Sequence, residues 1–209
     1  MSNPELLVAP CDYKAAKFAV EHWHYSGCMP KSKLVKFGVW ENNQFIGAIV
    51  YGVGATSDLV KSYDLNKDEG CELVRIALKQ HDSTVTRIIS LSMSQLKSAC
   101  PGLRLIVSFA DPEHNHNGSI YQAGNWLYTG MTISSPEYIV NGKRWHGRAL
   151  RHEKPDHLTT RQYLVIADPN YKVVDGSKKY RYLYPLDRAM RRQIEPLAKP
   201  YPKRVHASD

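Results

Sequence analysis

The chain has 209 residues, and its 28 Lys and Arg against 20 Asp and Glu give a formal net charge of +8 with histidine neutral. A content of 43% hydrophobic, 10% aromatic and 23% charged residues is typical of a globular domain and excludes disordered, collagenous and coiled-coil chains. No apolar run reaches the roughly 20 residues that span a bilayer, and the N-terminus lacks the basic and apolar regions of a signal peptide. We therefore expect a cytoplasmic protein with no membrane partner.

The first predicted elements are a helix and a β-hairpin. Residues 12–23 predict a helix capped by Asp12. Apolar residues recur on it at helical spacing and make its histidine a core residue; this face comprises Ala15, Phe18, Ala19, His22 and Trp23. The segments 35–41 and 44–52 predict two strands, joined by an Asn-Asn hairpin turn.

Strands and helices alternate after this hairpin. A short strand is predicted at 72–78, and a buried strand at 103–110. The helix between them begins at Asp82 or Ser83, either of which can cap it. Its apolar stripe consists of Val85, Ile88, Ile89, Ser92, Met93 and Leu96.

A short helix and a second hairpin complete the predicted core. Asn117 can cap the helix, which carries Ile120 and Tyr121. Asn141-Gly142 between two apolar runs is the strongest hairpin signal in the chain. The order helix, hairpin, strand, helix, strand, helix, strands predicts a mixed α/β (α+β) fold with an antiparallel start.

The last 59 residues are more basic than the rest. Residues 151–209 hold 13 basic and 7 acidic side chains, against 15 and 13 in residues 1–150, and they contain six of the 13 tyrosines. We therefore divide the chain into a core, 1–150, and a basic, Tyr-rich C-terminal extension, 151–209, packed on that core. Such an extension suggests a polyanionic partner, although basic charge alone does not require one.

Within this extension, residues 180–184 alternate tyrosine with other residues, which on a strand places three tyrosines on one face. These rings either stack on nucleic-acid bases or pack on the core, and the sequence leaves both open. A helix capped by Asp187 follows. The predicted phosphate contacts are Lys178, Lys179, Arg181, Arg188, Arg191 and Arg192.

Polar residues gather after the strand at 103–110. Asp111 stands at its carboxyl end, where open α/β sheets bind ligands, and is a candidate general base. Tyr121, near the start of the next helix, is a candidate proton donor. For His114 we favour a solvent-facing position.

Two further groups are candidates for chemistry. His24 and Tyr25 follow the last turn of the first helix, where they either point into a cleft or serve the structure. Arg75 lies inside an apolar strand and needs a partner, either a carboxylate such as Glu72 or a bound ligand. The set His24, Asp111 and His116 combines two imidazoles with one carboxylate, as in the facial triad that binds ferrous iron.

The strand and helix around Asp111 resemble those of the GNAT acyltransferase fold. The likeness rests on SFAD at 108–111 and on the spacing Asn117-x3-Tyr121-x2-Gly124. It implies a mainly antiparallel mixed sheet and a tyrosine that protonates the departing thiolate. It also places Ser83 and Thr84 at the phosphates of acetyl-CoA, where the family has glycines that let backbone N–H groups reach them. Here QHDSTV at 80–85 lacks both glycines, so acetyl-CoA binding is altered or lost.

Longer strings resemble the phage Mom family of DNA-modification proteins. They are WHYSG at 23–27, ELVR at 72–75, CPGLRLIVSFADP at 100–112 and HNGSIYQAGNWLYTG at 116–130. The resemblance implies an enzyme that installs a carbamoylmethyl group on N6 of adenine in DNA, which shields phage DNA from host restriction. By position, it implicates His24, Tyr25, Arg75, Asp111 and Tyr121 in activity.

This chemistry sets further expectations. Acetyl transfer would leave an N-acetyl group, whereas the implied product has a methylene bonded to nitrogen. We therefore expect a metal, most plausibly iron, with acetyl-CoA absent or not the immediate donor. The adenine must be flipped out of a duplex or lie in single-stranded DNA. The alternatives are a CoA-dependent N-acetyltransferase of a small amine or protein, and a non-catalytic DNA-binding protein.

Overall fold

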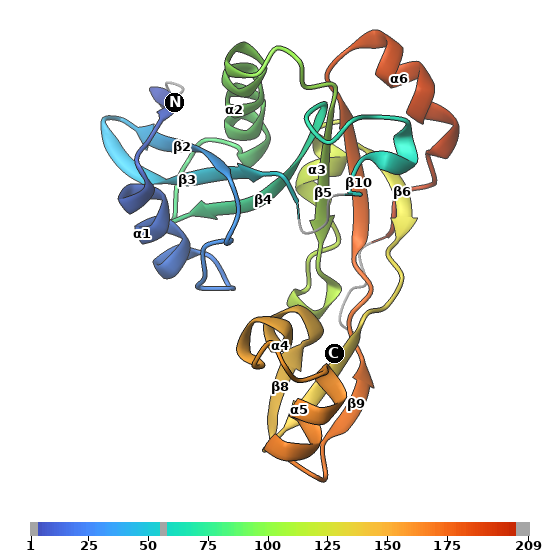
Figure 1. The fold of residues 1–209 in the computed structure, drawn as a ribbon. Helices are drawn as coiled ribbons and strands as arrows, with labels where there is room; N and C mark the ends of the chain where they lie inside the picture. The colour runs from blue at the N-terminus through green and yellow to red at the C-terminus, as the bar shows by residue number, and fades with distance from the viewer. Residues whose placement is uncertain (1–3, 55–57, 204–209) are drawn as a thin grey trace.

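A computed structural model of the protein describes residues 4–54 and 58–203. It contains a seven-stranded sheet in the order β1-β2-β3-β4-β5-β10-β6 and a three-stranded sheet in the order β8-β7-β9 (Figure 1). The strands are β1 (Leu6–Pro10), β2 (Leu34–Glu41), β3 (Gln44–Gly52), β4 (Gly70–Leu78), β5 (Leu105–Ala110), β6 (Leu127–Met131), β7 (Pro136–Val140), β8 (Lys143–His146), β9 (Lys172–Asp175) and β10 (Tyr180–Pro185). The α-helices are α1 (Tyr13–Trp23), α2 (Val85–Ala99), α3 (Ser119–Ala123), α4 (Gly147–Glu153), α5 (Thr160–Ala167) and α6 (Arg188–Ile194). The 3-10 helices are η1 (Lys61–Tyr63), η2 (Pro112–His114) and η3 (Glu195–Leu197).

The main sheet is antiparallel except between β4 and β5. These two strands pair in parallel only from Gly70 opposite Leu105 to Glu72 opposite Val107. Each strand then continues while pairing only with its other neighbour, β3 or β10. The two strands therefore diverge, which leaves an opening within the sheet.

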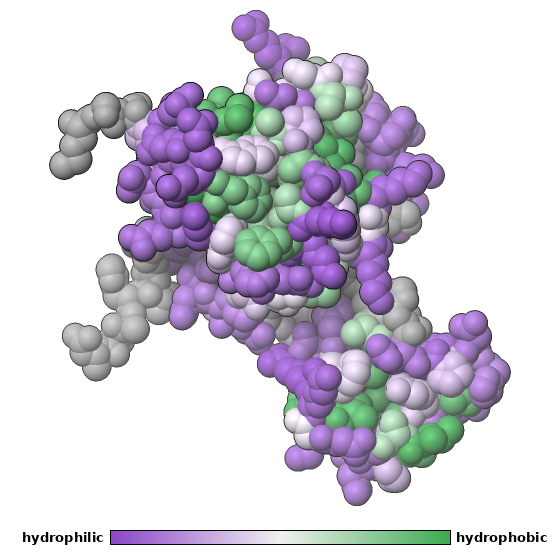
Figure 2. All heavy atoms as spheres, turned by 90° about the vertical axis from the view of Figure 1, so that its left-hand side faces the viewer, coloured by the Kyte–Doolittle hydropathy of each residue, from purple (hydrophilic) through white to green (hydrophobic). Residues whose placement is uncertain are grey.

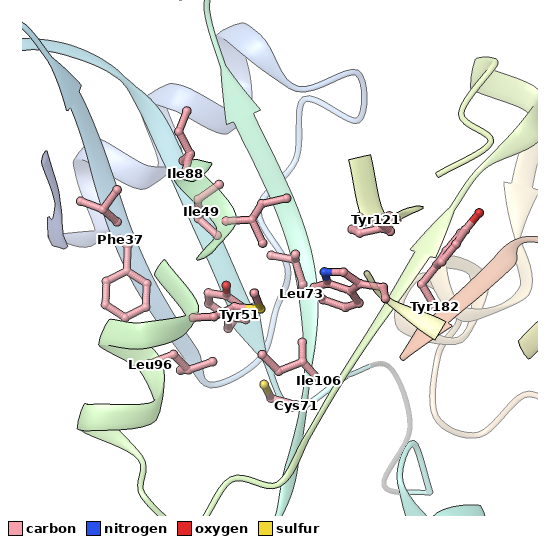
Figure 3. Packing of buried hydrophobic residues seen from close by; sticks show 14 of the residues in the cluster. Phe37, Ile49, Tyr51, Cys71, Leu73, Ile88, Leu96, Ile106, Tyr121 and Tyr182 are labelled. Atoms are coloured by element: carbon pink, nitrogen blue, oxygen red, sulfur yellow. The ribbon is translucent and has the colours of Figure 1, made fainter. Parts of the chain in front are cut away.

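The two longest helices cover opposite faces of this sheet. Because side chains alternate along a strand, Ile49 and Tyr51 of β3 pack in the cluster that contains α2, whereas Ala48 and Val50 pack in the cluster that contains α1. Figure 3 shows the first cluster, in which residues of β2, β3, β4 and β5 meet the apolar face of α2. Its members include Tyr182 of β10, so the C-terminal part of the chain belongs to the main core.

The helix boundaries follow the sequence closely, but two predicted caps are wrong. Helix α3 begins after Gly118, and the predicted Asn117 does not cap it. Asp12 caps α1 as predicted, accepting a hydrogen bond from the backbone N–H of Ala15 at 2.7 Å. The cap of α2 is Thr84, whose hydroxyl accepts from Arg87, and not Asp82 or Ser83. The backbone N–H groups of Asp82 and Ser83 instead donate to the carboxylate of Glu41 at the end of β2.

The buried face of α1 also differs from the predicted one. It consists of Ala16, Ala19 and Val20, one position away from the predicted stripe, while Phe18 is 47% exposed. His22 is exposed and stacks on Phe18 with 4.2 Å between ring centroids, so its prediction as a core histidine is wrong. The small alanines allow this helix to lie close to β3 and β4, a contact that periodicity alone does not rank above the aromatic stripe.

Residues 132–179, between β6 and β10, form a small lobe that is connected to the main sheet by two linkers. The lobe contains the second sheet, α4 and α5, with a core of Val140, Leu150 and Leu164, and Figures 1 and 2 show it set apart from the main body. The predicted boundary at residue 150 falls inside α4. The residues after it supply β9 to the lobe and β10 to the interior of the main sheet, because β10 lies between β5 and β6.

Candidate active site

A cavity of about 490 Å³ occupies the opening where β4 and β5 diverge. Its walls come from the end of α1, from β4, from the end of β5 and from the loop that leads into α3. Among the described residues, the polar and titratable side chains of this wall are His24, Tyr25, Arg75, His81, Asn115, His116, Asn117, Ser119 and Tyr121. None of them is a carboxylate, so the wall suits a polar, electron-rich ligand, and the volume is in the range of small-molecule pockets.

His24 is held in one neutral tautomer by the turn that follows α1. Its Nδ1 accepts a hydrogen bond from the backbone N–H of Ser26 at 3.1 Å and lies 2.8 Å from the hydroxyl of Ser26. An Nδ1 that accepts carries no proton, so the proton of the neutral ring is on Nε2. Burial and the nearby charge of Arg75 lower the pKa of His24 to about 4. At neutral pH His24 is therefore a hydrogen-bond donor through Nε2 and not a base.

Arg75 reaches the cavity from β4. Its Nε donates to the carbonyl of Cys28 at 3.3 Å, and Nη1 donates to the carbonyl of Val74 at 2.7 Å. Within the described chain no carboxylate forms an ion pair with Arg75, and the predicted pairing with Glu72 is not formed. Backbone carbonyls thus satisfy part of the guanidinium and orient it, and its positive charge remains available to a ligand.

Tyr121 is buried in the cavity wall, and hydrogen bonds connect its hydroxyl through Ser108 to the backbone of β4. Its OH lies 2.7 Å from the hydroxyl of Ser108, which in turn lies 3.0 Å from the carbonyl of Leu73. The carbonyl can only accept, so when Ser108 gives it its one proton, Tyr121 must donate to Ser108. Burial raises the pKa of Tyr121 to about 12, which keeps the phenol protonated at neutral pH. Tyr121 therefore holds a proton at the cavity wall. It donates this proton to Ser108 when Ser108 donates to Leu73, and it is free to donate into the cavity when Ser108 donates to the phenol instead.

The loop before α3 is positioned by β10. The hydroxyl of Tyr182 donates to the carbonyl of Asn117 at 2.6 Å, and Gly118 lies so close that a Cβ would come within 2.2 Å of the ring of Tyr182. Tyr180, Tyr182 and Tyr184 all pack in or against the main core. Of the two predicted roles of these tyrosines, stacking on bases and packing on the core, the structure shows packing on the core.

Asp111 does not line the cavity. Its buried carboxylate lies 3.0 Å from the ammonium of Lys179, accepts from the hydroxyl of Ser177 at 3.0 Å, and accepts from the backbone N–H of Glu113 at 3.1 Å. Burial raises the pKa of Asp111, but these donors outweigh it and hold the pKa below its usual range. The carboxylate connects the end of β5 to the linker that returns from the small lobe. Its contacts therefore indicate a structural role for Asp111 and not that of a general base.

An aromatic cluster stands beside the cavity. Tyr25 lies between His24, with ring centroids 4.3 Å apart, and His114, with centroids 4.0 Å apart, while His116 meets its edge at 5.4 Å. His114 is exposed, as predicted, and its ring also belongs to this cluster. Burial, followed by the charge of His114, lowers the pKa of His116, so His116 is neutral at neutral pH and lines the cavity as a potential base.

The predicted metal ligands are not assembled. His24 and His116 line the cavity, but the carboxylate of Asp111 is engaged by Lys179 and Ser177, and Nδ1 of His24 is engaged by Ser26. Over residues 4–54 and 58–203 no group of three His, Cys, Asp or Glu side chains is arranged to hold a metal ion. The residues do not fit the predicted iron in this arrangement, and we derive no step through a metal.

The predicted cofactor and phosphate contacts lie elsewhere. Ser83 and Thr84 lie outside the cavity wall. Lys178 and Lys179 precede β10 near the end of β5, whereas the exposed residues Arg188, Arg191 and Arg192 of α6 follow its other end. The six residues of β10 span roughly 20 Å at about 3.3 Å per residue, so the predicted contacts form two separate groups. Arg181 lies between them and is half-buried.

Ser26 and Ser108 are site residues that no sequence pattern predicts. Serines are common, and only their contacts mark these two, since Ser26 fixes the tautomer of His24 and the hydroxyl of Ser108 is hydrogen-bonded to that of Tyr121. Both stand inside strings that matched a known family, so their presence was visible while their contacts were not. The described residues include no helix with the length and apolarity needed to cross a membrane.

The fold is similar to that of solved acetyltransferases. Spermidine N-acetyltransferase from Vibrio cholerae has a TM-score of 0.52 and 10% identity, covering 90% of this chain and 97% of that one. Ribosomal-protein-S5-alanine acetyltransferase from Vibrio fischeri has a TM-score of 0.50 and 12% identity, with the same coverage of 90% and 97%. Together with the mixed, mainly antiparallel sheet, these likenesses confirm the predicted GNAT-like fold.

The sequence comparisons identify the family. Methylcarbamoylase mom of Escherichia phage Mu is 24% identical over 210 residues, which cover 96% of this chain and 85% of that protein. The model of the Mom protein family matches residues 5–203. Since this match extends over nearly the whole chain, the protein belongs to the Mom protein family.

Proposed function

We propose that the protein is a phage DNA-modification enzyme, a transferase that installs a carbamoylmethyl group on N6 of adenine and so shields DNA from host restriction. The observation that carries the proposal is the convergence of His24, Tyr25, Arg75 and Tyr121 on one cavity, in a chain of the Mom family. The relationship to methylcarbamoylase mom of phage Mu supports the identity of the group. The acetyltransferase-like fold supports a transferase.

The cavity gives these residues separate tasks. Its volume of about 490 Å³ accommodates a flipped adenine, which must leave the duplex or come from a single strand because N6 is otherwise paired and stacked. Tyr25 is half-exposed and already stacks with two imidazoles, so a base would extend this stack of His24, Tyr25 and His114 at one of its ends. His24 donates from Nε2 to an acceptor of the base or of the donor molecule.

Proton transfer falls to other side chains. N6 loses one proton when it bonds to the incoming methylene carbon, and we assign its acceptance to the neutral ring of His116, which lines the cavity. The leaving group departs from that carbon with the bonding electrons, and Tyr121 can protonate it. Asp111, predicted as the base, acts instead by holding the loop that carries His116.

The test is a nucleoside analysis of DNA from bacteria that express the protein. We expect a deoxyadenosine that is heavier by one carbamoylmethyl group and absent from bacteria with the empty vector. A nucleoside carrying an acetyl group would support the N-acetyltransferase alternative. DNA that stays unmodified while the purified protein binds it would support a non-catalytic DNA-binding protein.

A further inference from the structure

The loop between β4 and α2 already binds an anion that belongs to the chain itself. Glu41, the last residue of β2, directs its carboxylate at this loop: Oε2 accepts from the backbone N–H of Asp82 at 2.9 Å, and Oε1 accepts from that of Ser83 at 2.8 Å. Both oxygens are used, and Glu41 is only 7% exposed. The carboxylate is therefore a buried, two-pronged ligand of the loop.

A loop at the start of a long helix can bind an anion. Unpaired N–H groups and the helix dipole attract phosphates there, and α2, with 15 residues, is the longest helix in the described part of the chain. The acyltransferase-like fold implies acetyl-CoA as a donor, whose diphosphate would need such N–H groups. In this chain the N–H groups of Asp82 and Ser83 are occupied by Glu41, and the hydroxyl of Thr84 caps the helix itself.

We propose that Glu41 determines donor specificity by closing the diphosphate site, so that the donor is not a CoA thioester anchored at the β4–α2 loop. A diphosphate would have to displace a buried carboxylate and would also meet the negative side chain of Asp82. Like charges brought this close repel strongly where water is excluded. The donor is instead recognised within the cavity, where Arg75 supplies a positive charge and no carboxylate lines the wall.

Two properties of the site support this assignment. The backbone N–H groups of Asp82 and Ser83 lower the pKa of Glu41, which keeps the carboxylate ionised at neutral pH. The contact also joins distant parts of the chain, since Glu41 ends the β2–β3 hairpin and the loop follows β4 on the far side of β3. The proposal concerns how the donor is held and stands apart from which group is transferred.

The test follows the amides of Asp82 and Ser83 by NMR in the 15N-labelled full chain. We expect CoA and inorganic pyrophosphate to leave both amide signals of the wild-type protein unshifted, and both signals to titrate at acid pH as Glu41 takes up a proton. Saturable shifts of these amides with CoA would overturn the proposal. So would amides that do not respond to acid.

Variants separate Glu41 from the missing glycines. In Glu41→Ala both N–H groups lose their acceptor, and we expect inorganic pyrophosphate to shift the two amides saturably. Glu21→Ala, which removes an exposed carboxylate of α1, is the matched control and should behave as wild type. If Glu41→Ala folds and pyrophosphate does not shift its two amide signals, Glu41 is not the group that closes the site. If that variant does not fold, the wild-type titrations still decide whether the carboxylate occupies the loop.

Discussion

At the scale of single residues, the neutral state of His24 is the feature with the clearest consequence for pH. Its pKa is about 4 in the folded protein against an ordinary value of 6.5, so the unfolded chain binds more protons between these values. The free energy of unfolding should therefore fall as pH drops from 6.5 to 4 and then level off. Denaturation of wild type and His24→Gln across this range measures the effect, since the variant should lose stability less steeply. Parallel curves would contradict a neutral His24.

Tyr121 leads to a prediction about activity. Tyr121→Phe removes the phenolic proton and should reduce DNA modification by about 100-fold or more, the usual range for a lost general acid. The lost hydrogen bond to Ser108 should cost only about 1 kcal/mol of stability. Tyr201→Phe is the matched control, because it removes a hydroxyl that donates to the carbonyl of Trp126 at 2.8 Å, outside the cavity wall. Equal losses of activity in the two variants would place the effect in folding.

At the scale of elements, the contact between Asp111 and Lys179 decides what the aspartate does. If Asp111 is a tether between β5 and the linker before β10, Asp111→Asn and Lys179→Met should reduce stability and modification to a similar extent. Each leaves a buried or half-buried partner without its bond, at a cost of about 1–3 kcal/mol. If Asp111 were the general base, only Asp111→Asn would be inactive. Urea denaturation and nucleoside analysis of both variants distinguish the two.

The loop before α3 can be tested through a pair of glycines. Gly118 and Gly142 have similar φ angles of +78° and +74°, so an alanine is strained by the backbone in both, but only Gly118 faces an obstacle, the ring of Tyr182. Gly118→Ala should therefore lose at least about 1–3 kcal/mol more stability than Gly142→Ala, from overpacking. It should also reduce modification, because the loop carries cavity residues. Equal stability in the two variants would show that β10 does not fix this loop.

Most of the elements could be predicted from the sequence because their signals are local. The Asp12 cap, the hairpins at 42–43 and 141–142 and the helix at α2 follow from turn residues and periodicity. The position of β10 could not be predicted, because its insertion between β5 and β6 depends on pairing with strands far away in the sequence. Of the site, the residues were predicted but not their contacts: nothing local shows that Asp111 meets Lys179 or that Ser26 fixes His24.

Across the whole molecule, the exposed basic residues predicted to contact phosphates form two groups at opposite ends of β10, and these groups need not contribute equally to DNA binding. Lys178 is exposed and lies near the cavity end of β10, whereas Arg191 and Arg192 are exposed on α6 at the other end. We expect Lys178→Ala to weaken DNA binding and to lower the salt slope of log affinity by about 1, as for one lost phosphate contact. Arg191→Ala with Arg192→Ala should have the smaller effect. Salt titrations of binding to a short duplex give both slopes.

The small lobe adds to this basic surface. Residues 132–179 contain nine Lys and Arg against five Asp and Glu, which is half of the net charge of +8 in less than a quarter of the chain. Arg144 of β8 also pairs with Glu113 of η2 at 3.2 Å, so the lobe contacts the segment that carries His114. Residues 151–209, predicted as one extension, contribute to the small lobe, to the interior strand β10 and to α6.

We propose that adenine is modified in the cavity between β4 and β5. Mass spectrometry of nucleosides from bacteria expressing the wild-type protein, His24→Gln, Tyr121→Phe or Tyr201→Phe tests this. We expect a carbamoylmethylated deoxyadenosine with wild type and Tyr201→Phe, and its near absence with the two cavity variants although both remain folded. Wild-type levels of the modified nucleoside in folded His24→Gln and Tyr121→Phe would contradict it.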